Sequence, residues 1–217
     1  MKFPNAAKGV KKIFTAEILT LISALAMIVA VVMMIVTLLA AGSDSSSGAI
    51  AAGIGTIVLM AGSAILALIA GILSLVGIIN ASKDESAFKT ALYAIILSLV
   101  AAAVMGIFSS SATVQSICQS VQNVMSIIVT IYVIHGVTNL AEKLNNAEVA
   151  QKGKKLLMII VVIYVLALVA NILVLVFGGM FASVTAGIIG LAALVLDVIG
   201  YIVYLSLLSK GKKMLEA

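Results

Sequence analysis

Six apolar stretches dominate the sequence, and each is long enough to cross the hydrocarbon core of a bilayer, which needs about 20 helical residues. They cover roughly residues 17–41, 49–79, 90–108, 117–138, 156–177 and 182–208. Because 64% of the 217 residues are hydrophobic and only 10% are charged, too few polar side chains remain to cover a soluble domain. The sequence therefore predicts an all-α integral membrane protein with six transmembrane helices.

The basic residues predict how these helices are oriented. All 13 are lysines, and they lie in the two terminal segments, in the connection between the second and third stretches, and in that between the fourth and fifth. The other three connections contain no lysine. Since short lysine-rich loops stay in the cytoplasm, we predict a single membrane domain over residues 1–217, with both termini cytoplasmic. Its three hairpins span roughly 13–81, 88–141 and 154–209.

The first stretch has an alternative interpretation as a cleaved signal peptide, because lysines precede it and the small pair Ala40-Ala41 ends it. Its apolar run of about 24 residues exceeds the roughly 7–15 of a signal peptide core, which favours a membrane span.

The fourth stretch is ambiguous in another way. Its strongly apolar part covers only Val124–Ile134, and the residues before it are polar. Residues 109–123 therefore form either an outer loop or the first part of the fourth helix.

A basic motif recurs at the lysine-bearing segments, as K-G-V-K-K at 8–12 and as K-G-K-K at 152–155 and 210–213. It is not a phosphate-binding loop, because the pattern G-x-x-x-x-G-K-[ST] is missing. Without arginine the chain also lacks the side chain that reads guanine edges, so no nucleic-acid partner is expected. Lysines next to a span are attracted to anionic lipid headgroups, and we expect this contact from Lys152, Lys154, Lys155, Lys210, Lys212 and Lys213.

Small residues recur at intervals of four in three of the spans, a pattern typical of close helix contacts in membranes. The members are Ala94, Ser98, Ala102 and Gly106 in the third span, Ser63, Ala67 and Gly71 in the second, and Ala186 and Gly190 in the sixth. We expect these faces to pack against helices of the same chain or of another copy. The expected partners are thus the lipid bilayer and further membrane subunits, by self-association or with other proteins.

Asp197 is the most costly residue to insert into a bilayer. It lies about 20 Å of helix rise from Lys210, near the bilayer centre, where a charged carboxylate costs roughly 2.5–3.5 kcal/mol. It should therefore lie on the interior face of the sixth helix. Either it takes up a proton or a cation with Tyr201, Asn171 and Thr130 supplying neutral oxygens, or it is a protonated acid hydrogen-bonded across the bundle.

A second polar set lies on the outer half of the fourth span. Its members are Gln115, Gln119, Gln122 and Ser126. If this region is helical within the bundle, the set would line an uncharged, water-accessible vestibule; if it is a loop, the spacing is accidental.

No catalytic motif is recognisable in the sequence. A single cysteine, Cys118, and a single histidine, His135, allow neither an intramolecular disulfide nor an ordinary zinc site, and no metal or cofactor is expected. We expect a non-enzymatic membrane protein that forms a compact bundle, as a homo-oligomer or as a subunit of a larger assembly. The alternative is a small ion-coupled or proton-coupled channel or transporter that uses Asp197. The lysine-rich composition and short loops suit a bacterial cytoplasmic membrane.

Overall fold

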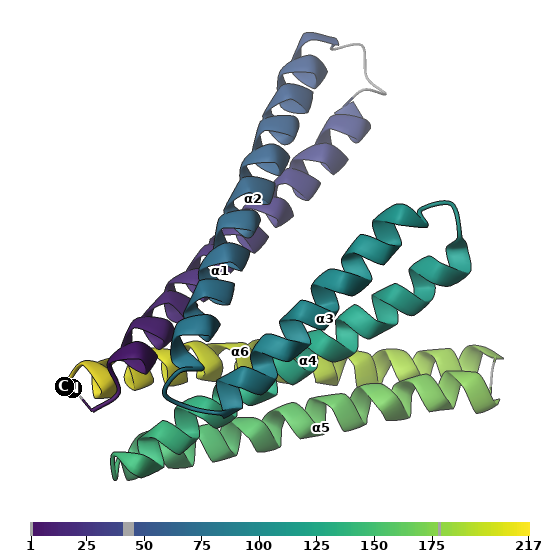
Figure 1. The fold of residues 1–217 in the computed structure, drawn as a ribbon. Helices are drawn as coiled ribbons and strands as arrows, with labels where there is room; N and C mark the ends of the chain where they lie inside the picture. The colour runs from purple at the N-terminus through teal and green to yellow at the C-terminus, as the bar shows by residue number, and fades with distance from the viewer. Residues whose placement is uncertain (1, 41–45, 178) are drawn as a thin grey trace. The chain divides into compact units, whose positions relative to one another are not determined.

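The computed structural model describes residues 2–40, 46–177 and 179–217, and within them the chain forms six helices and no strand (Figure 1). The helices are α1 (Pro4–Ala40), α2 (Ser46–Ala81), α3 (Ala87–Ile107), α4 (Ala112–Lys143), α5 (Ala147–Phe177) and α6 (Gly179–Glu216). The prediction of an all-helical chain is thereby confirmed. Within the described residues, five helices are long and apolar enough to span a membrane, namely α1, α2, α3, α4 and α6.

Some predictions concern parts of the chain that lie outside this description. Residues 41–45, in the first predicted connection, are among them, as are the side chains of much of the second half of α5. A membrane crossing by α5, the sides on which the termini lie and the single membrane domain stay predictions.

The described chain divides into two compact units. One is Lys12–Gly77, which contains most of the α1–α2 hairpin. The other combines the residues up to Lys11 with Ile78–Ala217, and so contains the start of α1, the end of α2 and all of α3 to α6.

Small side chains spaced seven residues apart form the contact within the α1–α2 hairpin. The buried members are Ala16, Ser23 and Ala30 on α1, and Thr56, Ser63, Ala70 and Gly77 on α2. A seven-residue repeat keeps a seam on one face of two helices that coil around each other. The Ser23 hydroxyl donates a hydrogen bond to the Ser63 carbonyl across this seam, at 2.8 Å. The small side chains allow the backbones to approach this closely.

The large apolar side chains of the same hairpin point outward. Leu25, Ile28 and Leu68 are 56%, 60% and 68% exposed. In water such a surface would promote aggregation, whereas lipid tails or another membrane helix can cover it without cost to polar groups.

In the other unit α4 is the central helix, since it contacts α3, α5 and α6. Its buried residues lie mainly between Val133 and Ala141, near the end that carries Lys143, whereas residues 119–132 include none that is buried. The largest buried side chains of the neighbouring helices, such as Phe88 and Leu207, also lie near lysine-bearing ends. Among the side chains that the structure describes, the apolar core of this unit is therefore concentrated beside its polar ends.

The start of α4 resolves the ambiguity over residues 109–123. Ser111 adopts an extended conformation, and its hydroxyl accepts a hydrogen bond from the amide of Val114 at 3.4 Å. This is an N-cap, which satisfies one of the free amides of a first helical turn. The helix begins at Ala112, so the polar segment that follows is helical rather than a loop.

The connection from α4 to α5 is a short turn built by two asparagines. Asn145 has a φ of 55°, a left-handed conformation that asparagine tolerates, and the amide of Asn146 donates to the carbonyl of Ala141 at 2.8 Å. The Asn146 side chain then accepts from the amide of Val149 at 3.1 Å and caps the start of α5. One residue pair thus ends one helix and begins the next.

The last connection is shorter than predicted. Residues 178–181 separate the fifth and sixth predicted stretches, but α6 already begins at Gly179. The residue types that follow the two glycines are compatible with a helix, namely Met180, Phe181 and Ala182. Only the glycines therefore favoured an interruption between the fifth and sixth helices.

Candidate functional site

Asp197 lies on the surface of α6 when a single copy of the chain is considered, inside the apolar segment Gly187–Glu216. Helix α6 packs against α5 through a neighbouring face, where Gly200 is buried and a Cβ atom would lie 3.6 Å from Ile159 and Ile163. Within one copy, therefore, the carboxyl does not lie in an interior.

Of the other predicted members of this polar site, Tyr201 lies one turn from Asp197 on the same helix, whereas Thr130 lies on α4 and bonds locally. The Thr130 hydroxyl donates to the Ser126 carbonyl of its own helix at 3.1 Å. The ring of Tyr201 lies 6.4 Å from that of Tyr204. The side chain of Asn171 lies outside the described part of the chain.

The predicted vestibule residues lie on the first half of α4, which is helical. Gln115, Gln119 and Ser126 are exposed and Gln122 is partly exposed. Gln115 donates to the carbonyl of Ser109 and Gln119 to the side chain of Asn123, so both amides bond locally. A water-filled vestibule at these residues stays a prediction.

The four-residue stripes coincide with the observed helix contacts only in part. On α3, Ala94 is buried and Ser98 half-buried, but Ala102 and Gly106 are exposed. On α2, Ser63 is buried, whereas Ala67 and Gly71 are exposed. A step of four residues rotates by about 40° beyond a full turn, so such a stripe leaves the contact after a few turns.

The same geometry applies to the sixth span. Gly190 is exposed, and no atom would lie within 4 Å of a Cβ at this position. The side chain of Ala186 lies outside the described part. Gly106 and Gly71 are equally open, so these three glycines contact no other helix of the described chain.

Glycines outside the predicted stripes make the closest helix contacts. A Cβ atom on Gly136 would lie 2.5 Å from the ring of Phe88, and one on Gly211 would lie 2.8 Å from Val137. Gly153 faces the hydroxyl of Thr138 and has no room for a Cβ. Gly153 and Gly211 are the glycines of the two K-G-K-K motifs. The repeated glycine of this motif is therefore the sequence feature that could have predicted these close helix contacts.

The lysines of the basic motifs differ in their partners. Lys154 pairs with Glu142 at 2.7 Å, Lys210 pairs with Glu148, and Lys152 donates to the hydroxyl of Ser206 at 2.5 Å. Lys212 also has an interaction within the chain. Lys155 and Lys213 are exposed and have no ion pair among the described residues. Contact between these lysines and lipid headgroups stays a prediction.

Two carboxyl groups at the lysine-bearing ends have altered acidity. Burial raises the pKa of Glu85, but hydrogen bonds from Lys143 and Asn139 and the charge of the lysine outweigh this effect. The pKa of Glu85 therefore lies below its ordinary value of 4.5. The hydrogen bond and charge of Lys210 lower the pKa of the exposed Glu148. Both groups are ionised at neutral pH and take part in ion pairs rather than in proton transfer.

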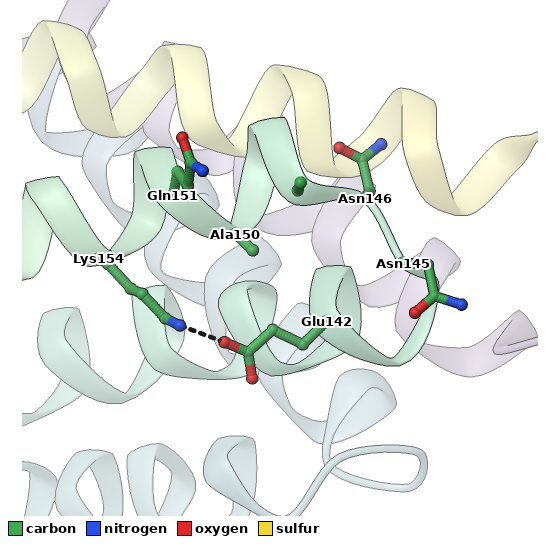
Figure 2. A pocket seen from close by; sticks show the side chains of 7 residues that line it. Glu142, Asn145, Asn146, Ala150, Gln151 and Lys154 are labelled. Atoms are coloured by element: carbon green, nitrogen blue, oxygen red, sulfur yellow. Dashed lines mark ion pairs between the residues drawn. The ribbon is translucent and has the colours of Figure 1, made fainter.

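A recess of about 370 Å³ lies at the turn between α4 and α5. Figure 2 shows the ammonium of Lys154 reaching Glu142 across it, with Asn145, Asn146 and Gln151 at its border. The ion pair is about half exposed, and such pairs contribute only about 0–1 kcal/mol to stability. No group of three or more metal-ligating side chains occurs among the described residues, here or elsewhere. The recess therefore offers polar groups but no reactive arrangement.

Comparison with models of protein families, with curated protein sequences and with solved structures gives no significant match for this chain.

Proposed function

We propose that the chain is a non-enzymatic multi-pass membrane protein that self-associates in the bilayer through one side of α6. This surface, the Asp197 side of α6, consists of Gly190, Leu194, Asp197 and Tyr201, which follow one another at successive helical turns. The observation that carries the proposal is the exposure of Asp197 in a segment apolar enough to span a membrane.

The cost of exposing a carboxyl to lipid supports a protein partner at this surface. A charged group at the centre of a bilayer costs roughly 2.5–3.5 kcal/mol, and even a neutral carboxyl has hydrogen-bonding groups that lipid tails cannot satisfy. Leu194 is 61% exposed beside it, and the open position at Gly190 leaves room for a second backbone. Small residues next to a polar one are the usual composition of a membrane helix contact.

A second copy of the same chain fits this surface. Two copies related by a twofold axis along the membrane normal would place identical residues of α6 at equal depth. Asp197 would then meet the carboxyl or the Tyr201 hydroxyl of the other copy. No lysine lies within a predicted span, so two carboxyls would share a proton rather than pair with a cation.

Particle mass in lipid nanodiscs tests the proposal. The wild-type chain should be a dimer or larger, and Asp197→Leu should weaken association by about tenfold, the effect of one membrane hydrogen bond of about 1–2 kcal/mol. Ile199→Leu, on the opposite side of α6 and 46% exposed, should leave the mass unchanged. A wild-type particle that stays monomeric at high protein-to-lipid ratio would refute self-association.

A small channel or transporter is the second candidate, favoured by the position of Asp197 and Tyr201 one turn apart in a segment apolar enough to span a membrane. An acid beside a phenol within a span is a plausible stopping point for a proton or cation. In liposomes, Asp197→Asn should then abolish a flux that the wild-type chain supports. Equal flux from the two proteins, or none from either, would contradict this function.

A further inference from the structure

The connection between α2 and α3 carries two adjacent acids that bind two different helices. Its backbone is held in a tight turn, in which the amides of Asp84 and Glu85 both donate to the carbonyl of Ala81 at 3.1 Å. Neighbouring residues of a rigid turn direct their side chains differently, so one short connection can reach two partners.

Asp84 binds the first turn of α1. One carboxylate oxygen accepts from the side-chain amide of Asn5 at 3.0 Å, and the other accepts from the backbone amide of Ala6 at 2.8 Å. The first amides of a helix have no partner within the helix, and a negative charge there is favourable. Helix α1 therefore receives a cap from a residue that lies 78 positions further along the chain.

Glu85 binds the end of α4. It accepts a hydrogen bond from the Asn139 side chain at 3.2 Å and forms an ion pair with Lys143 at 2.5 Å. Its side chain is only 3% exposed, whereas that of Lys143 is 50% exposed. A buried carboxylate needs such partners, so Glu85 holds the connection firmly to the end of α4.

Apolar contacts accompany the polar ones at the start of α1. Ala6, Ala7 and Val10 are buried, and the side chain of Val10 lies near Gly211 of α6. Lys11 pairs with Glu216 at 3.7 Å. These residues belong to the unit formed by α3 to α6, although the rest of α1 belongs to the other unit.

We propose that Asp84 and Glu85 form a two-armed latch, in which Glu85 fixes the connection to α4 and Asp84 holds the first turn of α1 against it. The Asp84 arm is the releasable one, because it is only partly buried and its carboxylate has no cationic partner among the described residues. Release of this arm would free the start of α1 while the connection keeps its place on α4. This inference does not depend on self-association.

Amide hydrogen exchange of the full chain in nanodiscs tests the latch. In Asp84→Ala, the segment 3–10 should exchange about tenfold faster, as expected for one lost hydrogen bond to a charged group, while residues 82–86 and 139–143 keep their wild-type rates. In Glu85→Gln, the segments 3–10 and 82–86 should both exchange faster, because the fixed arm is weakened. Lys83→Ala is the matched control in the same connection and should change neither.

The exchange rate of segment 3–10 in these variants decides whether the latch exists. An Asp84→Ala protein with wild-type exchange in 3–10, or a Lys83→Ala protein with equally fast exchange there, would overturn the proposal. If Asp84→Ala does not fold, Asn5→Ala removes one hydrogen bond of the same arm and leaves the carboxylate in place. It should then raise exchange in 3–10 to a smaller extent, and no change in 3–10 would count against the latch.

Discussion

Glycine at position 136 allows the ring of Phe88 to lie directly on the backbone of α4. Phe88 is fully buried, so its ring is enclosed by protein. The contact joins α3 to α4 in the part of α4 where most of its buried residues lie. At this scale, the absence of one side chain determines how closely two helices pack.

Gly136→Ala should lower the free energy of unfolding by about 1–3 kcal/mol, because overpacking outweighs the gain of up to about 1 kcal/mol in helix propensity. Gly106→Ala is the matched control, since no atom lies within 4 Å of the added Cβ, and it should be neutral or stabilising. Thermal unfolding in a mild detergent measures both. Equal effects of the two substitutions would contradict the importance of the Phe88 contact.

At the scale of single helices, the α1–α2 seam shows what the sequence pattern did and did not reveal. Ser63 was predicted as a contact residue, and it is buried in the seam. Its predicted companions Ala67 and Gly71 are exposed, because the seam continues through Ala70 and Gly77 instead. In a helix rich in Ala, Gly and Ser, intervals of four and of seven both occur, and only the partner helix selects between them.

Ala30→Leu should lower the unfolding temperature, since Ala30 is fully buried in the seam and a larger side chain would separate the backbones at a cost of about 1–3 kcal/mol. Ala24→Leu makes the same change on an exposed position of the same helix and should have little effect. The measurement is thermal unfolding followed by circular dichroism. A larger loss of stability from Ala24→Leu would show that the seam is misassigned.

At the scale of the whole chain, long apolar runs were sufficient to predict the helices, because twenty apolar residues leave few alternatives to a membrane span. The polar start of α4 could not be predicted in this way. Its helical state depends on the Ser111 cap, and the amides of Gln115 and Gln119 are engaged in local hydrogen bonds. The position of Asp197 could not be predicted either, since helix spacing places it beside Tyr201 but does not say which face of α6 packs on α5.

The lysine-bearing ends make a further prediction about lipids. Replacing Lys155 and Lys213 together by glutamine should weaken the binding of an anionic lipid by about 1 kcal/mol per lysine. The matched control is the neutral double substitution Glu142→Gln with Lys154→Gln, which removes an existing ion pair and should leave lipid binding unchanged. Native mass spectrometry with added phosphatidylglycerol can compare them, and equal lipid retention by all three proteins would contradict the assignment.

The seven-residue seam between α1 and α2 has a consequence for helix register. A slide of one helix by one repeat, about 10.5 Å, would again bring small residues opposite small residues, so the seam alone distinguishes poorly between the two alignments. Asp84 follows the end of α2 and holds the amide of Ala6 at 2.8 Å, a bond that no such slide could preserve. A polar contact at one end can thus choose the alignment of two apolar helices along their whole length.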